Sequence, residues 1–191
     1  GEPDSNPISE NNSTKGKTIY GISKIIGEEY CKAYKKKFNL NYTILRFFNT
    51  YGPNQDNKFV ITKFIYAAVN NKPLVINGNG NQKRSYTYVQ DSARATVIVA
   101  FNKKTNQKTY NVGNGTEPVT LKELADKISK KFKKKIKIKY KRNFNGADRT
   151  KDREIFMRYC DSSKIRKAIN WKPLVKIDEG ISRIIKFFKN V

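Results

Sequence analysis

The sequence contains no histidine and only two cysteines among its 191 residues. Cys31 and Cys160 stand far apart and have no metal-ligand spacing, so neither a zinc site of clustered Cys and His nor an imidazole-based catalytic triad is available. Two isolated cysteines predict reduced, structural thiols, as is usual in a cytoplasmic protein.

Long apolar runs are also missing. No stretch of about 18 apolar residues occurs, which is what a membrane-spanning helix requires. The first residues are Gly-Glu-Pro-Asp and not the basic and then apolar residues of a signal peptide. We therefore expect a soluble cytoplasmic protein that is not exported and has no membrane partner.

Acidic residues are scarce, because 16 Asp and Glu stand against 40 Lys and Arg, a net charge of +24. Such an excess attracts nucleic acid, acidic membranes or small phosphorylated molecules. Lysine is spread with asparagine along the whole length, which favours a general compositional bias over a binding stripe on one face. A polyanion- or nucleic-acid-binding module, motivated also by residues 127–142, is the alternative from another functional class.

Strands and helices alternate along the chain after a polar loop at residues 1–17. Apolar residues at helical spacing predict helices at 18–38, 59–70, 91–101, from 120 onward, 162–169 and 178–189. Strands are predicted at 42–48, 74–76, 85–89, 109–112 and 133–142. Asn39 ends the first helix, Asp91 is expected to cap the third, and Thr-Leu-Lys-Glu from Thr120 is a capping box. The alternation indicates an α/β protein.

The first predicted helix carries Tyr20 and, four residues later, Lys24. At that spacing both side chains lie on one helical face, so the ammonium lowers the pKa of the phenol and makes Tyr20 a plausible general base near neutral pH. The pair alone is a weak motif in a chain this rich in lysine. A solvated lysine beside a packed tyrosine is the competing interpretation.

Five segments occur in an order that resembles the extended short-chain dehydrogenase/reductases, specifically the nucleotide-sugar epimerase and dehydratase family, which includes UDP-glucose 4-epimerase. They are Tyr20-Gly21-x-Ser23-Lys24 with Glu28 following, residues 45–53 (Leu-Arg-Phe-Phe-Asn-Thr-Tyr-Gly-Pro), residues 77–91 (Asn-Gly-Asn-Gly-x-Gln-x-Arg-Ser-Tyr-x-Tyr-Val-x-Asp), residues 110–113 (Tyr-Asn-Val-Gly) and residues 161–181 (Asp-x-Ser-Lys leading to Trp-x-Pro and Glu-Gly-Ile). They span nearly the whole chain, and their shared order is a stronger signal than any one of them.

The resemblance implies an enzyme that uses NAD or NADP on a nucleoside-diphosphate sugar. Tyr20 corresponds to the residue that takes the proton from the sugar 4-hydroxyl while hydride leaves C4 for the nicotinamide. Lys24 would lower the Tyr20 pKa and bind the nicotinamide ribose. Phe47 and Phe48 would lie near the nicotinamide, with plain core packing as the alternative. The resulting 4-keto sugar is reduced from the other face, dehydrated or decarboxylated. We expect 4-epimerisation ahead of 4,6-dehydration or decarboxylation.

The resemblance also implies a set of substrate contacts. Asn49 and Arg84 correspond to residues that bind the diphosphate, and a guanidinium suits phosphate oxygens. Val60, Ile61 and Val75 correspond to the nucleobase cradle, with plain core packing as the alternative. Asn111 and Asp148 match less well, because the family's Arg-x-Gly-Asp is absent; the arginine could come from Arg142, Arg149 or Arg158.

The expected fold is the C-terminal part of an NAD(P)-binding, Rossmann-like doubly wound parallel sheet plus a small α/β substrate-binding domain. Residues 18–58 and parts of 81–115 are assigned to the end of the Rossmann-like domain. Residues 59–80 and 116–191 are assigned mainly to the small domain, so the two interleave.

The family's glycine-rich cofactor turn has no counterpart, because neither Gly78-x-Gly80 nor Gly113-x-Gly115 has a third glycine in register. The Ser or Thr that partners the tyrosine would also precede Gly1. We therefore expect an N-terminally truncated chain that is inactive alone and does not retain NAD; a cofactor-free relative is the other interpretation. A homodimer is expected for the complete enzyme, with an interface on the helix of Tyr20 at Ile22, Ile26, Ala33 and Tyr34.

Overall fold

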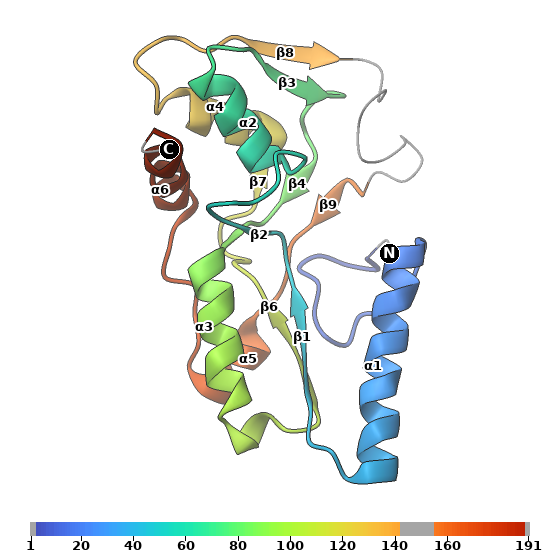
Figure 1. Cartoon of the computed structure of the whole chain (residues 1–191). Helices are drawn as coiled ribbons and strands as arrows, with labels where there is room; N and C mark the ends of the chain where they lie inside the picture. The colour runs from blue at the N-terminus through green and yellow to red at the C-terminus, as the bar shows by residue number, and fades with distance from the viewer. Residues whose placement is uncertain (1–2, 142–154, 190–191) are drawn as a thin grey trace.

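A computed structural model describes residues 3–141 and 155–189 of the chain (Figure 1). Asp148, predicted to contact the substrate, and two of the three candidate arginines, Arg142 and Arg149, lie outside these ranges. Among the described residues, none of the helices is both long and apolar enough to cross a membrane.

Short strands and helices alternate along the chain, as the sequence predicts. The strands are β1 (Thr43–Phe47), β2 (Thr50–Tyr51), β3 (Leu74–Asn77), β4 (Lys83–Arg84), β5 (Thr87–Tyr88), β6 (Lys108–Val112), β7 (Val119–Thr120), β8 (Ile138–Lys141) and β9 (Met157–Arg158). The helices are α1 (Ile19–Phe38), α2 (Val60–Val69), α3 (Val89–Ala100), the 3₁₀ turn η1 (Lys103–Thr105), α4 (Leu121–Ser129), α5 (Ser163–Ile169) and α6 (Ile177–Lys189).

Parallel pairing dominates the strands. β1 pairs with β6, β2 with β5 and β3 with β8, each in parallel, while β7, β4 and β9 form a mixed sheet in that order. Parallel strands need crossover connections, and the helices supply them. The α/β fold class is therefore confirmed, as part of a Rossmann-like parallel sheet with a second α/β unit.

Two hydrophobic cores divide the described residues. The β1–β6 core lies in the lower half of Figure 1, where α3 and α5 pack on the parallel pair and bury Ala95, Val99, Tyr110, Val112, Ile165 and Trp171. The larger α2–α6 core lies in the upper half, where α2, α4 and α6 enclose Phe64, Leu74, Leu124, Ile128 and Ile181. The division of the chain into two functional domains stays a prediction. α5 and Trp171, which fall in the range assigned mainly to the small domain, pack in the β1–β6 core.

Several local predictions are confirmed. α1 begins after Thr18 and ends at Asn39, which adopts a left-handed φ of 54°. The capping box at α4 is present, because the Thr120 hydroxyl accepts from the Glu123 amide and the Glu123 carboxylate accepts from the Thr120 amide. The last strand predicted before residue 142 is shorter than expected and starts at Ile138, since only four residues find partners on β3.

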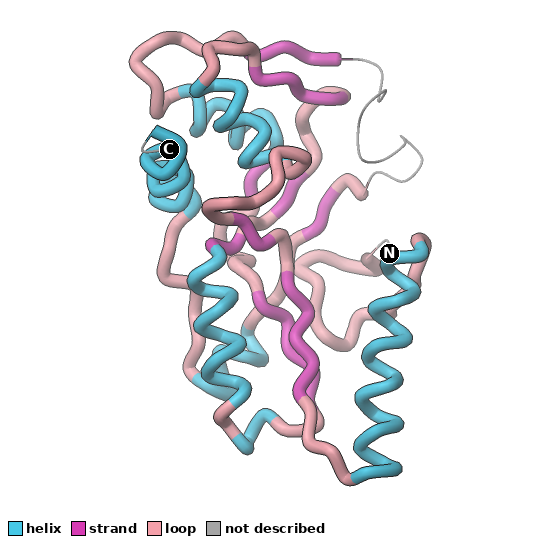
Figure 2. Tube along the Cα trace, viewed as in Figure 1, coloured by secondary structure: helices cyan, strands magenta, loops and turns pink. Residues whose placement is uncertain are grey.

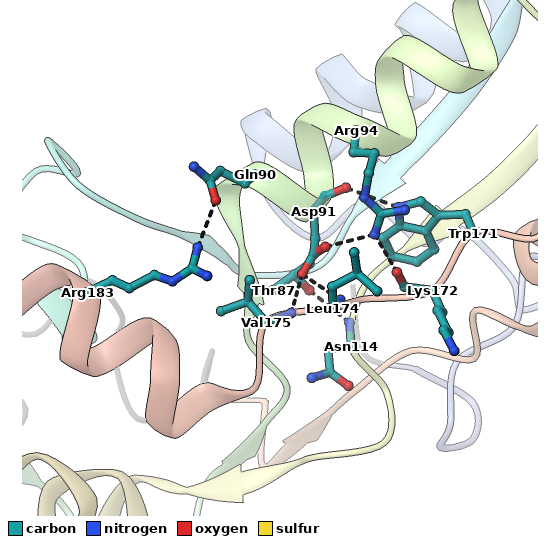
Figure 3. Close-up of polar contacts among 10 residues, drawn as sticks. All are labelled: Thr87, Gln90, Asp91, Arg94, Asn114, Trp171, Lys172, Leu174, Val175 and Arg183. Carbon is teal, nitrogen blue, oxygen red and sulfur yellow. Dashed lines mark hydrogen bonds and ion pairs between the residues drawn. The ribbon is translucent and has the colours of Figure 1, made fainter.

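The prediction that Asp91 caps α3 is wrong. The helix begins at Val89, and Asp91 lies inside its first turn with a nearly fully buried side chain. Its carboxylate accepts from the amides of Leu174 (3.0 Å) and Val175 (2.9 Å) and pairs with Arg94 at 2.8 Å (Figure 3). A buried carboxylate needs such partners, and here a distant segment supplies the amides in place of the first turn of the helix.

Both cysteines are free, as expected from the sequence, and they differ in environment. Cys160 is buried against the backbone at Gly113 and Gly115, where an added Cβ would lie 2.3 Å from the Cys160 sulfur and 1.9 Å from its carbonyl oxygen, respectively. Burial raises the pKa of the Cys160 thiol to about 12. This thiol therefore serves packing and not nucleophilic chemistry.

Candidate active site

Tyr20 and Lys24 lie together in the first two turns of α1. The Thr18 hydroxyl accepts from the Gly21 amide at 3.0 Å and starts the helix just before Tyr20. The ammonium nitrogen of Lys24 lies 5.0 Å from the centroid of the Tyr20 ring. Tyr20 is 71% exposed, so the phenol is open to a substrate and a cofactor. The structure thus brings the predicted base and cation together, and their catalytic role stays a prediction.

The position of α1 directs this pair toward one end of the sheet. α1 and β1 run in opposite directions in Figure 1, so the N-terminal end of α1 lies at the carboxyl end of β1. In open α/β sheets ligands bind at the carboxyl ends of the strands. Phe47, the last residue of β1, is 49% exposed at that end.

Asn49 and two arginines meet just beyond β1. Asn49 has a left-handed φ of 33°, and its amide nitrogen donates to the Ser85 carbonyl at 3.0 Å. Arg158 donates to the Asn49 side-chain oxygen at 2.9 Å. Because β4 and β9 are in register, Arg84 and Arg158 are neighbours on adjacent strands. Arg158 is the one candidate arginine that lies in the described ranges, and it contacts Asn49.

The Arg84 guanidinium is buried and already bound. It donates to the Lys83 carbonyl at 2.9 Å, to the Phe156 carbonyl at 3.1 Å and to the Ile155 carbonyl. A phosphate that binds the Arg84 guanidinium would therefore have to replace the carbonyls of residues 155 and 156 as hydrogen-bond acceptors. Two adjacent guanidiniums and the Asn49 amide are donors of the kind that bind a diphosphate.

The remaining predicted contacts differ in how open they are. Ile61 is 1% exposed in the α2–α6 core, while Val60 and Val75 are half-buried. Asn111 is buried, and its side-chain amide donates to the carbonyls of Ile8 and Asp161. Ile61 and Asn111 thus support the surrounding backbone, and a direct substrate contact by any of the four stays a prediction.

Sequence reasoning missed the backbone contributors to the site. Ser85 binds Asn49 through its carbonyl, and residues 155 and 156 bind Arg84 through theirs. The positions of backbone carbonyl groups cannot be inferred from side-chain motifs, and the short strand β9 that brings residues 155 and 156 to Arg84 was not predicted from the sequence.

Comparison with known proteins places this geometry in context. A family model described as GDP-mannose 4,6 dehydratase matches residues 1–184. A Methanocaldococcus jannaschii protein, provisionally named a UDP-glucose 4-epimerase, is 36% identical over 196 residues, covering 100% of this chain and 59% of that protein. The dTDP-glucose 4,6-dehydratase of Salmonella typhimurium is 30% identical over 177 residues, covering 88% of this chain and 46% of that enzyme.

A solved structure is similar over the whole chain. The UDP-glucuronic acid 4-epimerase of Bacillus cereus, in complex with UDP-glucuronic acid and NAD, has a TM-score of 0.84 and 28% identity, covering 100% of this chain and 58% of that one. The chain thus spans a little under three fifths of the epimerases it resembles and less of the dehydratase.

Proposed function

The chain belongs to the extended short-chain dehydrogenase/reductases that include NAD-dependent nucleotide-sugar epimerases and dehydratases, and from this premise we propose that it serves 4-epimerisation of a nucleoside-diphosphate sugar. It contributes the general base and part of the diphosphate site. The observation that carries the proposal is the placement of Tyr20 and Lys24 at the same end of the sheet as Asn49 and Arg158.

The residues act in named roles. Tyr20 takes the proton from the sugar 4-hydroxyl, and the Lys24 ammonium stabilises the resulting phenolate. Arg84, Arg158 and Asn49 hold the diphosphate and so fix the sugar relative to Tyr20, which lowers the entropic cost of reaching the reactive geometry.

NAD fits this end of the sheet only in part. When bound, NAD supplies the acceptor and donor of hydride for the oxidation and reduction of C4. Exposed Tyr20 and Lys24 suit the ribose side of the nicotinamide, and half-exposed Phe47 suits its ring. The cofactor diphosphate needs a glycine-rich turn, and this sequence has no such turn.

A 4,6-dehydratase or a decarboxylase of the same family is the second candidate. The matching family model is described as a dehydratase, and similarity to the Salmonella dehydratase is comparable to that to curated decarboxylases. All three reactions share the 4-keto intermediate and hence the same base. Product analysis by NMR of the nucleotide sugar, after incubation with the NAD-loaded holoenzyme, distinguishes an inverted 4-hydroxyl from loss of water or carbon dioxide.

The diphosphate site is tested by UDP binding to the 191-residue protein. Arg158→Ala is expected to weaken UDP binding roughly 10- to 100-fold, because a charge-assisted hydrogen bond contributes about 1.5–3 kcal/mol. Arg84→Lys keeps the positive charge but removes the planar pair of N–H donors, so a smaller loss of UDP affinity is expected than in Arg158→Ala. Isothermal titration at constant salt measures both. Arg166→Ala, an exposed arginine on α5, is the matched control; equal affinity of the Arg158 and Arg166 variants would refute the site.

NAD retention provides a separate test. We expect the purified 191-residue protein to release well under one NAD or NADP per chain when it is denatured, because Gly78 and Gly80 form a turn with positive φ after β3 and Gly113 packs on Cys160. Enzymatic cycling of the supernatant quantifies the cofactor. One cofactor per chain would show that a site outside the expected turn holds it.

A further inference from the structure

α1 carries the proposed base and cation, yet none of its 20 residues is buried. Its large apolar side chains Ile22, Ile26 and Tyr30 are 47%, 47% and 63% exposed, whereas Ile25 and Cys31 on the side of Glu28 are half-buried. Apolar contact of α1 with the described part of the chain is therefore slight. A specific polar contact adds to it.

The contact is a two-point ion pair between α1 and β1. Arg46 Nε donates to one carboxylate oxygen of Glu28 and Arg46 Nη2 to the other, each at 2.7 Å. The side chains are only 24% and 19% exposed. Two parallel hydrogen bonds from one guanidinium to one carboxylate fix the relative orientation of the two groups as well as the distance between them. Such a pair restrains rotation of the helix in a way that a single hydrogen bond cannot.

Arg46 also reaches a third segment. Its Nη1 donates to the Glu10 carbonyl at 3.2 Å, and the Glu10 carboxylate accepts from the Asn111 amide of β6 at 2.7 Å. The guanidinium thus joins α1, β1 and the N-terminal loop. By contrast, the neighbouring pair Glu29–Lys32 joins two residues of α1 itself, and its side chains are 63% and 52% exposed.

The spacing of residues connects this contact to the site. Tyr20, Lys24 and Glu28 follow one another at four-residue steps, which keeps them on one side of the helix. Tyr20 lies about 12 Å along α1 from Glu28 at 1.5 Å per residue. Asn49 lies about 10 Å along the chain beyond Arg46 at strand spacing. Because α1 and β1 run in opposite directions (Figure 1), the ion pair brings Tyr20 level with Asn49.

We propose that Glu28 and Arg46 are positioning residues: their ion pair holds α1 on β1 in the one rotation that aims Tyr20 and Lys24 at the diphosphate site. The catalytic meaning of this positioning rests on the proposed function. The ion pair as the attachment of α1 does not.

Hydrogen exchange of the 191-residue protein tests the attachment. Glu28→Gln removes the charge with little change of shape, and Glu29→Gln makes the same change one residue away. We expect the Glu28 variant to exchange its α1 amides about tenfold faster than the wild type, with α3 unchanged, and the Glu29 variant to match the wild type. Equal α1 exchange in the two variants would overturn the proposal.

Two further measurements test direction and not merely stability. With ¹³Cζ-labelled tyrosine, assigned through Tyr20→Phe, the Tyr20 resonance should move in Glu28→Gln and stay in Glu29→Gln. The charge swap Glu28→Arg with Arg46→Glu should return the exchange rate of α1 toward the wild type. A resonance that stays in place in Glu28→Gln would mean that the pair does not position the phenol.

Turnover separates the two proposals. In the holoenzyme, Glu28→Gln should lower kcat about tenfold while KM stays within twofold, because substrate binding uses other residues. An unchanged kcat beside faster α1 exchange would refute positioning and leave the proposed function standing. Absence of any turnover in the wild-type holoenzyme, with NAD bound, would refute the function, while exchange and NMR of the 191-residue protein still decide the role of the ion pair.

Discussion

Tyr20→Phe is expected to lower the rate of 4-epimerisation in the holoenzyme about 10²- to 10⁴-fold, the range typical for removal of a general base. The substitution removes one oxygen atom from a side chain that is 71% exposed, so folding should not change. KM for the nucleotide sugar should stay nearly constant, because Asn49, Arg84 and Arg158 of the proposed diphosphate site are unchanged. Steady-state kinetics with a coupled NADH assay give both parameters.

Tyr30→Phe is the control for that experiment. Tyr30 lies on the same helix and is 63% exposed, and no catalytic role is assigned to it. We expect wild-type rates in this variant. If Tyr20→Phe kept its rate within a few-fold of Tyr30→Phe, another group would have to be the base, and the assignment of the site would fail.

Asp91→Ala is expected to destabilise the protein by about 3–5 kcal/mol, the cost of breaking a buried ion pair by removing one partner. The substitution leaves the amides of Leu174 and Val175 without an acceptor, and it deprives Arg94 of its carboxylate. The Trp171 indole also donates to the Asp91 carbonyl (3.1 Å), so the same turn anchors the segment on both sides. Urea unfolding followed by circular dichroism measures the loss.

Glu179→Gln serves as the comparison for Asp91. Glu179 pairs with Arg183 on the surface of α6 at 2.6 Å, with both side chains largely exposed. Exposed pairs of this kind contribute little, so the unfolding midpoint should not change. Asp91→Asn, which keeps one acceptor oxygen, should fall between the two. A loss in Asp91→Ala no larger than in Glu179→Gln would contradict a structural role for the buried carboxylate.

These experiments address different links between sequence and function. The Tyr20 variant tests chemistry at an exposed group, whereas the Asp91 variant tests how α3 holds the segment that leads into α6 (Figure 2). Destabilisation by Asp91→Ala should lower activity at elevated temperature only, since Asp91 contacts backbone and Arg94. Loss of activity by Tyr20→Phe should be independent of temperature.

The sequence by itself determined α1 and the start of α4. The extent of α1, its start at Thr18 and its end at Asn39 were predictable, because capping and helical periodicity depend on neighbours a few residues away. The capping box of α4 and the Tyr20–Lys24 spacing follow from the same local rules. The order of motifs was also sufficient to predict the α/β fold class and the family.

Only the tertiary structure decided which distant groups meet. The pairing of β4 with β9 brings Arg158 opposite Arg84, and Arg158 also contacts Asn49, 109 positions earlier in the chain. Asp91 is a residue type that commonly caps helices, but its carboxylate accepts hydrogen bonds from the amides of residues 174 and 175 instead. Arg46 and Glu28 each stand in a recognised motif, but nothing in either motif predicted their contact. Each of these pairs joins residues many positions apart, so its partner depends on chain topology and not on periodicity.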